Sequence, residues 1–188
     1  MKFRPVLSVA AAATLAAGSF AIAGCDRQET AASQAKGDAD DAVLTGEIDR
    51  SHAGEPMPEA VLTLADGTTR TLDEFSGQPL LVNLWATWCA PCVLEMPMLD
   101  ALAKERKGEL AVLTVSQDLD GAEKVAAFFD QREFTMLRPW LDPENALGFA
   151  YGTGVLPTTV YYGSDGREIW RVVGGYDWSG AEAAQLFD

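Results

Sequence analysis

The chain has 188 residues, of which 48% are hydrophobic. This length supports one domain with its own core and some unstructured chain, and it is too short for two ordinary domains. The 28 acidic residues outnumber the 14 basic ones, which gives a net charge of −14. Because the phosphates of nucleic acid would be repelled, this balance argues against a nucleic-acid partner. It permits a basic protein partner, although most of these charges are expected to form a solvated surface.

The N-terminus has the pattern of an export signal. Lys2 and Arg4 give a charged start, and residues 6–23 form an apolar, alanine-rich stretch, as in segments that direct secretion. Removal of residues 1–24 would leave 12 basic against 28 acidic residues, a net charge of −16. The alternative is an uncleaved transmembrane anchor, for which the stretch is barely long enough and weakly hydrophobic. Either way, the domain would be tethered outside the cytoplasm.

The end of this stretch, Ile22-Ala23-Gly24-Cys25, resembles a bacterial lipobox. The resemblance implies that cleavage makes Cys25 the first mature residue and that this cysteine carries lipid. Asp26 resembles the signal that retains lipoproteins in the inner membrane of many Gram-negative bacteria. We therefore expect the protein to be held through lipid on Cys25 at the periplasmic face of the bacterial inner membrane.

A flexible acidic linker is expected at residues 25–53. The segment is rich in Ala, Asp, Gln, Gly and Ser and has few large apolar residues, so it cannot bury enough surface to fold. His52, the only histidine, lies at its end and is expected to be solvated. The folded domain would then span residues 54–188.

The domain begins with two short strands, predicted at residues 60–64 and 69–71, and a turn of helix at 72–75. The apolar run at residues 80–85 has the length of a buried parallel strand. The later elements are predicted in chain order as a helix closed by Gly108, a strand at 110–116, a helix from Asp120 to Arg132, a strand at 140–141, a helix at 145–151, strands at 158–162 and 168–173, and a terminal helix capped by Ser179. This order of a βαβ unit and then a ββα unit predicts a mixed sheet with helices on both faces.

Cys89 and Cys92 lie where the buried strand gives way to the long helix. Pro91 suits the first helical turn, because its missing N–H costs nothing there. Cys89 would then lie at the helix N-terminus, where unpaired N–H groups and the helix dipole favour a thiolate. We expect Cys89 to be the attacking nucleophile and Cys92 the resolving thiol of a redox disulfide.

Two other interpretations of the cysteine pair are a zinc site and a purely structural disulfide. Half of a zinc site would need two further ligands, and the chain otherwise offers only Cys25 and His52, both upstream of the predicted fold. A purely structural disulfide would close a very small loop, which stabilises little. The strand-to-helix context favours redox chemistry with no metal and no cofactor.

The motif Trp88-Cys89-Ala90-Pro91-Cys92 resembles the active site of the thioredoxin fold. Asn83 replaces the buried Asp that thioredoxin carries six residues before its first cysteine, and Glu95 follows Cys92 by three residues. This combination resembles the TlpA and ResA type of membrane-tethered thiol:disulfide interchange protein. Pro97 matches the kink proline of thioredoxins, and residues 154–159 resemble their cis-proline loop.

The resemblance runs from about Gly54 to about Glu182 and implies an α/β, thioredoxin-like fold with an N-terminal β extension. It also implies the roles of the site residues. Glu95 would accept the proton of the buried thiol, the alternative being an ordinary glutamate on the helix surface. Trp88, Ala90, Pro91, Leu156 and Pro157 would contact substrate, with a cis peptide bond before Pro157 that leaves backbone groups free for an extended client strand. Trp85 is expected in the core instead.

The function implied is that of a membrane-tethered periplasmic thiol:disulfide oxidoreductase that reduces protein disulfides through the Cys89 and Cys92 dithiol. By resemblance, the clients would be apocytochrome c or copper-site assembly proteins, and a transmembrane reductant of the DsbD or CcdA type would supply electrons. A thiol oxidant or isomerase of the same fold is one alternative, and a non-catalytic client-binding module is another. The peroxidase branch is disfavoured because its Thr-x-x-Cys signature is missing. The protein is expected to be a monomer.

Overall fold

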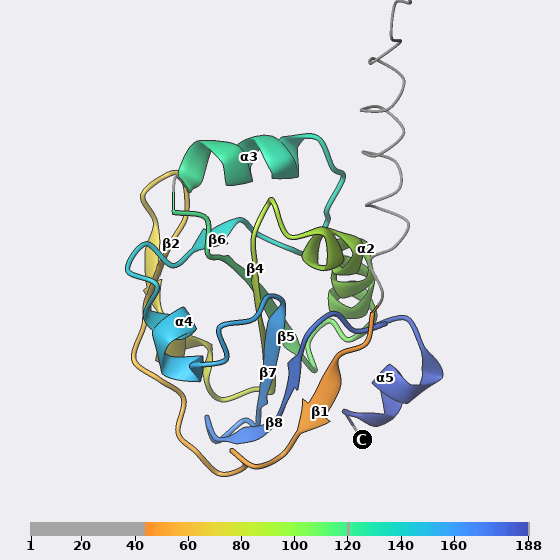
Figure 1. Cartoon of the computed structure of the whole chain (residues 1–188). Coiled ribbons are helices and arrows are strands. Elements are labelled where there is room, and N and C mark those ends of the chain that lie inside the picture. Colours follow the sequence, from red (N-terminus) through yellow and green to blue (C-terminus); the bar gives the residue numbers. More distant parts are fainter. Residues whose placement is uncertain (1–43, 120, 188) are drawn as a thin grey trace, which may run out of the picture.

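The computed structural model describes residues 44–119 and 121–187 (Figure 1). Its strands are β1 (Glu47–Asp49), β2 (Val61–Thr63), β3 (Thr69–Thr71), β4 (Leu80–Trp85), β5 (Ala111–Ser116), β6 (Trp140–Leu141), β7 (Thr158–Tyr162) and β8 (Glu168–Val173). Its helices are the 3-10 turn η1 (Leu72–Phe75) and α2 (Ala90–Glu105), α3 (Ala122–Asp130), α4 (Ala146–Tyr151) and α5 (Ala181–Gln185). The predicted order of elements from residue 60 onward is confirmed, and most of their ends agree with the prediction or differ by one or two residues.

One eight-stranded sheet runs through the domain in the order β1-β8-β7-β4-β5-β6-β2-β3. β4 pairs in parallel with β5 and antiparallel with β7, so the sheet is mixed as predicted. The β2–β3 hairpin joins through β6 and forms the N-terminal β extension at one edge. The C-terminal end of β4 therefore lies inside the sheet, where it leads directly into the Cys89 turn.

Strand β4 is buried on both faces, because helices cover both sides of the sheet (Figure 1). Leu81 and Trp85 pack with residues of α2, α3 and α5. Val82 and Leu84 pack on the opposite face with residues of α4. The strand is apolar throughout except for Asn83, which alternation places on the α2 face. Trp85 is in the core, as expected.

The N-terminal part of the sheet differs from the expectation. β1 lies within residues 25–53, where we expected a linker, and it pairs antiparallel with β8. Its Glu47-Ile48-Asp49 sequence is mostly exposed, and it is held through backbone pairing at a sheet edge. Composition could not reveal such a strand, because pairing of this kind needs no apolar side chains. The folded domain therefore begins before residue 54.

The expected signal at residues 1–24, the lipidation site Cys25 and the linker as far as residue 43 lie outside the described residues. Across residues 44–119 and 121–187, none of the helices has both the length and the apolar character that crossing a bilayer requires.

Candidate active site

The two cysteines of the motif form a disulfide at the start of α2. Cys89 is the N-cap residue of the helix, and its Sγ accepts a hydrogen bond from the N–H of Cys92 at 3.4 Å. The Cα atoms of Cys89 and Cys92 are 5.3 Å apart. Cys89 is 6% exposed and Cys92 is 0% exposed. A client can therefore approach Cys89 but not Cys92, an asymmetry that fits an attacking and a resolving sulfur.

The turn before Cys89 is fixed by Asp118, which the sequence analysis did not single out. Its carboxylate accepts hydrogen bonds from the N–H of Thr87 at 2.9 Å and from the Thr87 hydroxyl at 2.7 Å. The Ser116 hydroxyl donates to the same carboxylate at 2.8 Å. Because β5 runs parallel to β4, residues after both strands meet at one sheet edge. That topology was the signal that could have indicated Asp118.

Glu95 lies on the buried side of α2 and is 0% exposed. The backbone N–H of Tyr176 donates to Glu95 Oε1, and Asn83 Nδ2 donates to Glu95 Oε2 at 3.2 Å. The interpretation of Glu95 as a helix-surface residue is therefore wrong. The sequence could not indicate Tyr176, because its backbone N–H makes the hydrogen bond to Glu95 and every residue except proline has such a group.

Burial raises the pKa of Glu95 from 4.5 to about 7. The hydrogen bonds from Tyr176 and Asn83 act in the opposite direction, because they stabilise the carboxylate. Desolvation of the charged form is the larger effect. Glu95 can therefore gain and lose a proton near neutral pH, as a proton acceptor in thiol chemistry requires.

The Asn83 amide can serve both protonation states of Glu95. Its Nδ2 also donates to Thr159 Oγ1 at 2.9 Å, whereas its buried Oδ1 has no hydrogen-bond partner among the described residues. In this orientation the amide suits an ionised Glu95. Rotated by half a turn, Oδ1 would accept a hydrogen bond from a protonated carboxyl, since the orientation of an amide follows its hydrogen-bond network. An Asp at position 83 could not donate in this way when ionised.

The loop before β7 approaches the active-site turn from the other side. The peptide bond between Leu156 and Pro157 is cis, as expected. The Thr158 hydroxyl donates to the carbonyl of Val155 at 2.8 Å, which fixes the loop. Leu156 shares a groove with Trp88, which is 72% exposed. Two of the five residues predicted to contact substrate are thus brought together.

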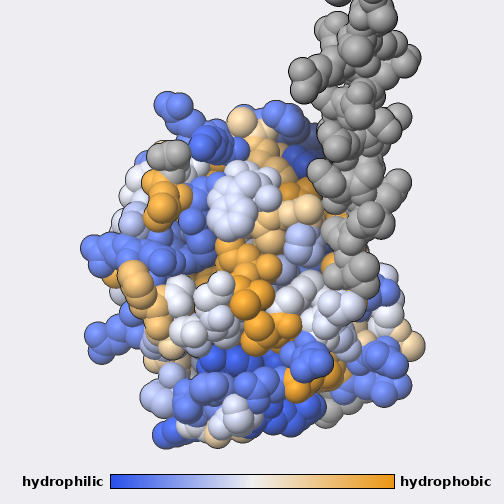
Figure 2. All heavy atoms as spheres, in the orientation of Figure 1, coloured by the Kyte–Doolittle hydropathy of each residue, from blue (hydrophilic) through white to orange (hydrophobic). Residues whose placement is uncertain are grey.

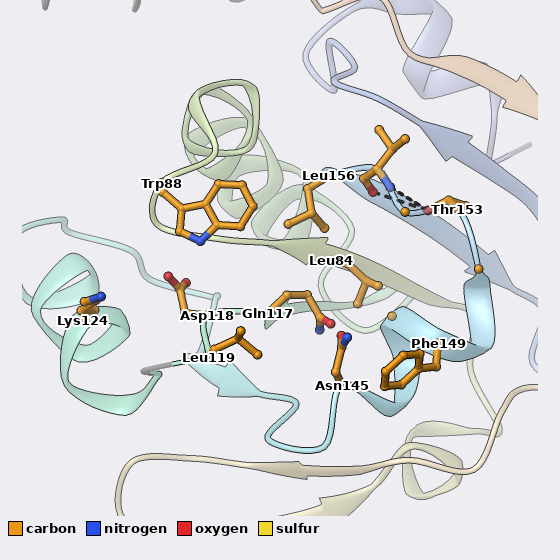
Figure 3. A pocket seen from close by; sticks show the side chains of 14 residues that line it. Leu84, Trp88, Gln117, Asp118, Leu119, Lys124, Asn145, Phe149, Thr153 and Leu156 are labelled. Atoms are coloured by element: carbon orange, nitrogen blue, oxygen red, sulfur yellow. Dashed lines mark hydrogen bonds between the residues drawn. The ribbon is translucent and has the colours of Figure 1, made fainter.

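The groove has a volume of about 670 Å³ and is formed by the turn before α2, the loop after β5, α4 and the cis-proline loop. Its lining includes Leu84, Trp88, Gln117, Asp118, Leu119, Asn145, Phe149 and Leu156. Figure 2 shows apolar side chains gathered between α2 and α4 on this face. In Figure 3, Trp88 and Leu156 lie along one side of the groove and Asn145 and Phe149 along the other.

The other residues predicted to contact substrate lie around this groove rather than in its lining. Ala90 is exposed at the start of α2, while Pro91 is partly buried beside the segment that follows β8. Pro157, the next residue after Leu156 in the chain, is buried. Within the described residues, no group of three or more His, Cys, Asp or Glu side chains is placed to hold a metal ion.

The chain was compared with known families, proteins and structures. The model of the redoxin family matches residues 52–185. The thioredoxin-like protein YneN of Bacillus subtilis is 35% identical over 56% of this chain and 62% of its own length. The thiol-disulfide oxidoreductase ResA of Bacillus thuringiensis is 27% identical over 67% of this chain and 72% of its own. The exposed lipoprotein thioredoxin Etrx1 of Streptococcus pneumoniae is structurally similar, with a TM-score of 0.59 and 26% identity over 69% of this chain and 97% of that one.

Proposed function

The chain belongs to the redoxin family and is a thiol-disulfide oxidoreductase of the ResA type, and from that premise we propose that it reduces disulfides of protein clients outside the cytoplasm. The observation that supports this most directly is the disulfide between a slightly exposed Cys89 and a buried Cys92 at a helix N-terminus. The groove beside Trp88 gives a client a place to bind next to Cys89.

The reaction is two consecutive disulfide exchanges. In the reduced protein, the Cys89 thiolate attacks one sulfur of the client disulfide, and the other client sulfur leaves as a thiolate that takes up a proton. Cys92 then attacks Cys89 Sγ, so that the mixed disulfide breaks and the Cys89–Cys92 disulfide forms. The second client sulfur leaves and is protonated. Two electrons pass from the protein to the client, and a reduced dithiol must return two electrons before the next cycle.

Glu95 is proposed to take the proton of Cys92. The two residues are one helical turn apart on the same helix and both are fully buried. A buried thiol cannot release its proton directly to water, so a nearby base with a pKa near 7 makes the resolving step faster. When the disulfide is reduced again, Glu95 can return the proton.

The direction of exchange is proposed from the surroundings of Cys89. Ala90 and Pro91, the two residues between the cysteines, supply no charge that would stabilise a thiolate. An ionised Glu95 would oppose that thiolate. Both features favour a reducing couple, with a potential nearer to thioredoxin's roughly −270 mV than to the roughly −120 mV of a strong oxidant.

Equilibration of the protein with a dithiothreitol or glutathione series, read by tryptophan fluorescence, tests this direction. We expect a potential well below that of an isomerase. A value more positive than about −180 mV would replace the reductase by an oxidant or isomerase. Cysteines that fail to cycle in a thiol-labelling assay would instead indicate a client-binding module.

The proposed clients are the heme-attachment cysteines of apocytochrome c or the cysteines of copper-site assembly proteins, and the proposed donor is a transmembrane reductant of the DsbD or CcdA type. A Cys92→Ala variant tests both, because it stops the reaction at the mixed disulfide and holds its partner for mass spectrometry. Trapped proteins without paired cysteines in a heme or copper motif would contradict the client proposal.

Attachment to the inner membrane through lipid on Cys25 is proposed from Ile22-Ala23-Gly24-Cys25, and the lipoprotein nature named for the similar Etrx1 supports it. Mass spectrometry of the membrane-extracted protein should show an acylated N-terminal Cys25. Residues 1–24 still attached to the protein would contradict the proposal.

A further inference from the structure

The peptide group between Gly175 and Tyr176 is hydrogen-bonded on both of its sides. Its N–H, that of Tyr176, donates to Glu95 Oε1. Its carbonyl, that of Gly175, accepts from the N–H of Gly46 at 2.6 Å. One rigid peptide plane therefore connects the N-terminal segment to the buried carboxyl of the redox site. Hydrogen bonds in such a chain polarise and strengthen one another.

The contact at Gly46 has no room for a side chain. A Cβ at position 46 would lie 2.6 Å from the carbonyl oxygen of Gly174, 2.8 Å from that of Gly175 and 2.8 Å from Val172 Cγ1. Backbone atoms cannot give way cheaply at such distances. The segment therefore crosses residues 174–175 at the closest approach that a glycine allows.

A second contact lies at the Cα of Gly175, next to the same peptide. A Cβ at Gly175 would lie 2.8 Å from Leu44 Cδ2 and 3.1 Å from Pro91 Cβ. Leu44 and Pro91 thus pack on the same buried glycine, Leu44 from the N-terminal segment and Pro91 from between the two cysteines. The Gly175 peptide is clamped by a hydrogen bond from Gly46 and by these two apolar side chains.

We propose that Leu44 and Gly46 form a positioning element of the redox site, which holds the Gly175–Tyr176 peptide so that its N–H stays directed at Glu95 while this carboxyl exchanges a proton with Cys92. The inference rests on the proposed role of Glu95. It assigns a task to the segment just before β1, beyond its backbone pairing with the sheet edge. Gly46 and Leu44 act through the peptide and do not touch the reacting sulfurs.

The Tyr176 N–H is one of the few groups that stabilise the buried carboxylate of Glu95. From β4, Asn83 donates to the carboxylate and in turn contacts Thr159 of β7. From the segment after β8, the Tyr176 N–H donates to the carboxylate. The Trp178 indole lies near enough to lower the pKa of Glu95, although its Nε1 has no hydrogen-bond partner among the described residues. On α2 itself, Cys92 is held in the disulfide and does not titrate in the oxidised chain. Burial raises the pKa of the Tyr176 phenol above its usual 10.0, so this group stays neutral near pH 7. Among the described residues, the groups that donate hydrogen bonds to Glu95 are all neutral. Neutral donors alone therefore offset the desolvation of its carboxylate.

The test is the titration of the Glu95 carboxyl by carbon-13 NMR in the full, oxidised chain, with the signal assigned by Glu95→Gln. In Gly46→Ala the added methyl group should push the segment away from residues 174–175 and weaken the bond from Tyr176. We expect the pKa of Glu95 to rise by about one unit. Leu44→Ala, which only removes packing, should raise it less and covers the case in which Gly46→Ala does not fold. Thr45→Ala, an exposed neighbour, is the matched control and should change nothing.

The pH profile of client reduction provides the second measurement. It should move with the carboxyl titration in Gly46→Ala, and this movement should vanish when Glu95→Gln is also present, because coupled residues are not additive. An unchanged Glu95 titration in both Gly46→Ala and Leu44→Ala would overturn the proposal, as would an equal profile shift in the Glu95→Gln background. The carboxyl titration needs no client, so it stands even if the proposed reductase activity fails.

Discussion

The two sides of the Cys89–Cys92 disulfide differ in the polarity and burial of the side chains that surround them. On the side of Cys92, Glu95 and Asn83 are fully buried and polar. On the side of Cys89, Trp88 and Phe149 are 72% and 77% exposed and line an open groove. Polar groups thus lie in the dry region, whereas large apolar groups face water.

This difference separates proton transfer, on the buried polar side, from client binding, on the exposed apolar side. A buried carboxyl feels its few hydrogen bonds strongly, because the surrounding dielectric is low, and so it can handle a proton near neutral pH. Exposed aromatic and aliphatic side chains gain free energy when a client covers them. Changes on the buried side should therefore alter pH dependence, and changes on the groove side should alter client binding.

The largest effect is expected at the disulfide itself, where the two regions meet. Cys89→Ala should reduce turnover to the uncatalysed rate, because no accessible sulfur remains. Cys92→Ala should also stop turnover, but it should accumulate mixed disulfides with clients. In the reduced wild type, Cys89 should alkylate faster than Cys92, as measured by mass spectrometry of quenched samples. Mixed disulfides in Cys89→Ala and none in Cys92→Ala would reverse the two roles.

Glu95→Gln tests the buried side. Burial raises the pKa of Glu95 from 4.5 to about 7, so between these values the folded protein binds a proton that the unfolded chain has released. Stability conferred by Glu95 is therefore present below about pH 4.5 and lost as pH rises to about 7. Over that window the loss is about 3 kcal/mol, and Glu95→Gln should not show it.

Urea unfolding of the oxidised protein at pH 4 and pH 8 measures this difference between wild type and Glu95→Gln. The variant should also fold normally, slow turnover and change the pH dependence of cysteine alkylation. Glu105→Gln, at the exposed end of the same helix, is the matched control. Parallel stability profiles for wild type and Glu95→Gln would contradict the burial argument.

The sequence predicted the disulfide side better than the groove side, for physical reasons. The apolar run of β4 and the spacing of Cys89, Cys92 and Glu95 are local patterns, so helix periodicity was enough to place them one turn apart. Whether Glu95 faced the sheet or the solvent depended on the helix orientation, which the structure supplies. The groove combines residues from four separate segments, and no local pattern contains it.

Two further features were missed because backbone atoms produce them. β1 is a polar edge strand that pairs through its main chain, and the Tyr176 N–H that contacts Glu95 belongs to no recognisable side-chain motif. Sequence patterns report side chains that avoid water. They do not report which N–H and C=O groups find one another.

Asp118→Asn tests the turn before Cys89, which lies between the buried polar side and the groove. Its carboxylate accepts hydrogen bonds from Thr87 and Ser116, and an amide would turn its NH2 group toward one of these donors. We expect a loss of about 2 kcal/mol in unfolding free energy, because hydrogen bonds to a charged acceptor are involved. The pH profile set by Glu95 should stay unchanged. The control for urea unfolding is Asp177→Asn, since the exposed carboxylate of Asp177 accepts hydrogen bonds from Ser179 in its own turn. Equal losses of unfolding free energy in both variants would contradict the role of Asp118 in fixing the Thr87 turn.

The smallest effect is expected in the groove, at Phe149. Its ring is 77% exposed and therefore contributes little to folding, but a client lying across the groove would cover it. Removing the ring in Phe149→Ala should cost about 1 kcal/mol of client binding, or roughly a fivefold rise in KM with kcat nearly unchanged. Reduction of a small disulfide that does not reach the groove should proceed as in wild type. Ile169→Ala removes another exposed apolar side chain, 42% exposed against 77% for Phe149, from β8, outside the groove lining. It should leave KM unchanged. If Phe149→Ala and Ile169→Ala gave the same KM, clients would not bind across the groove. The exposed apolar side chains beside Cys89 would then have no role in client binding.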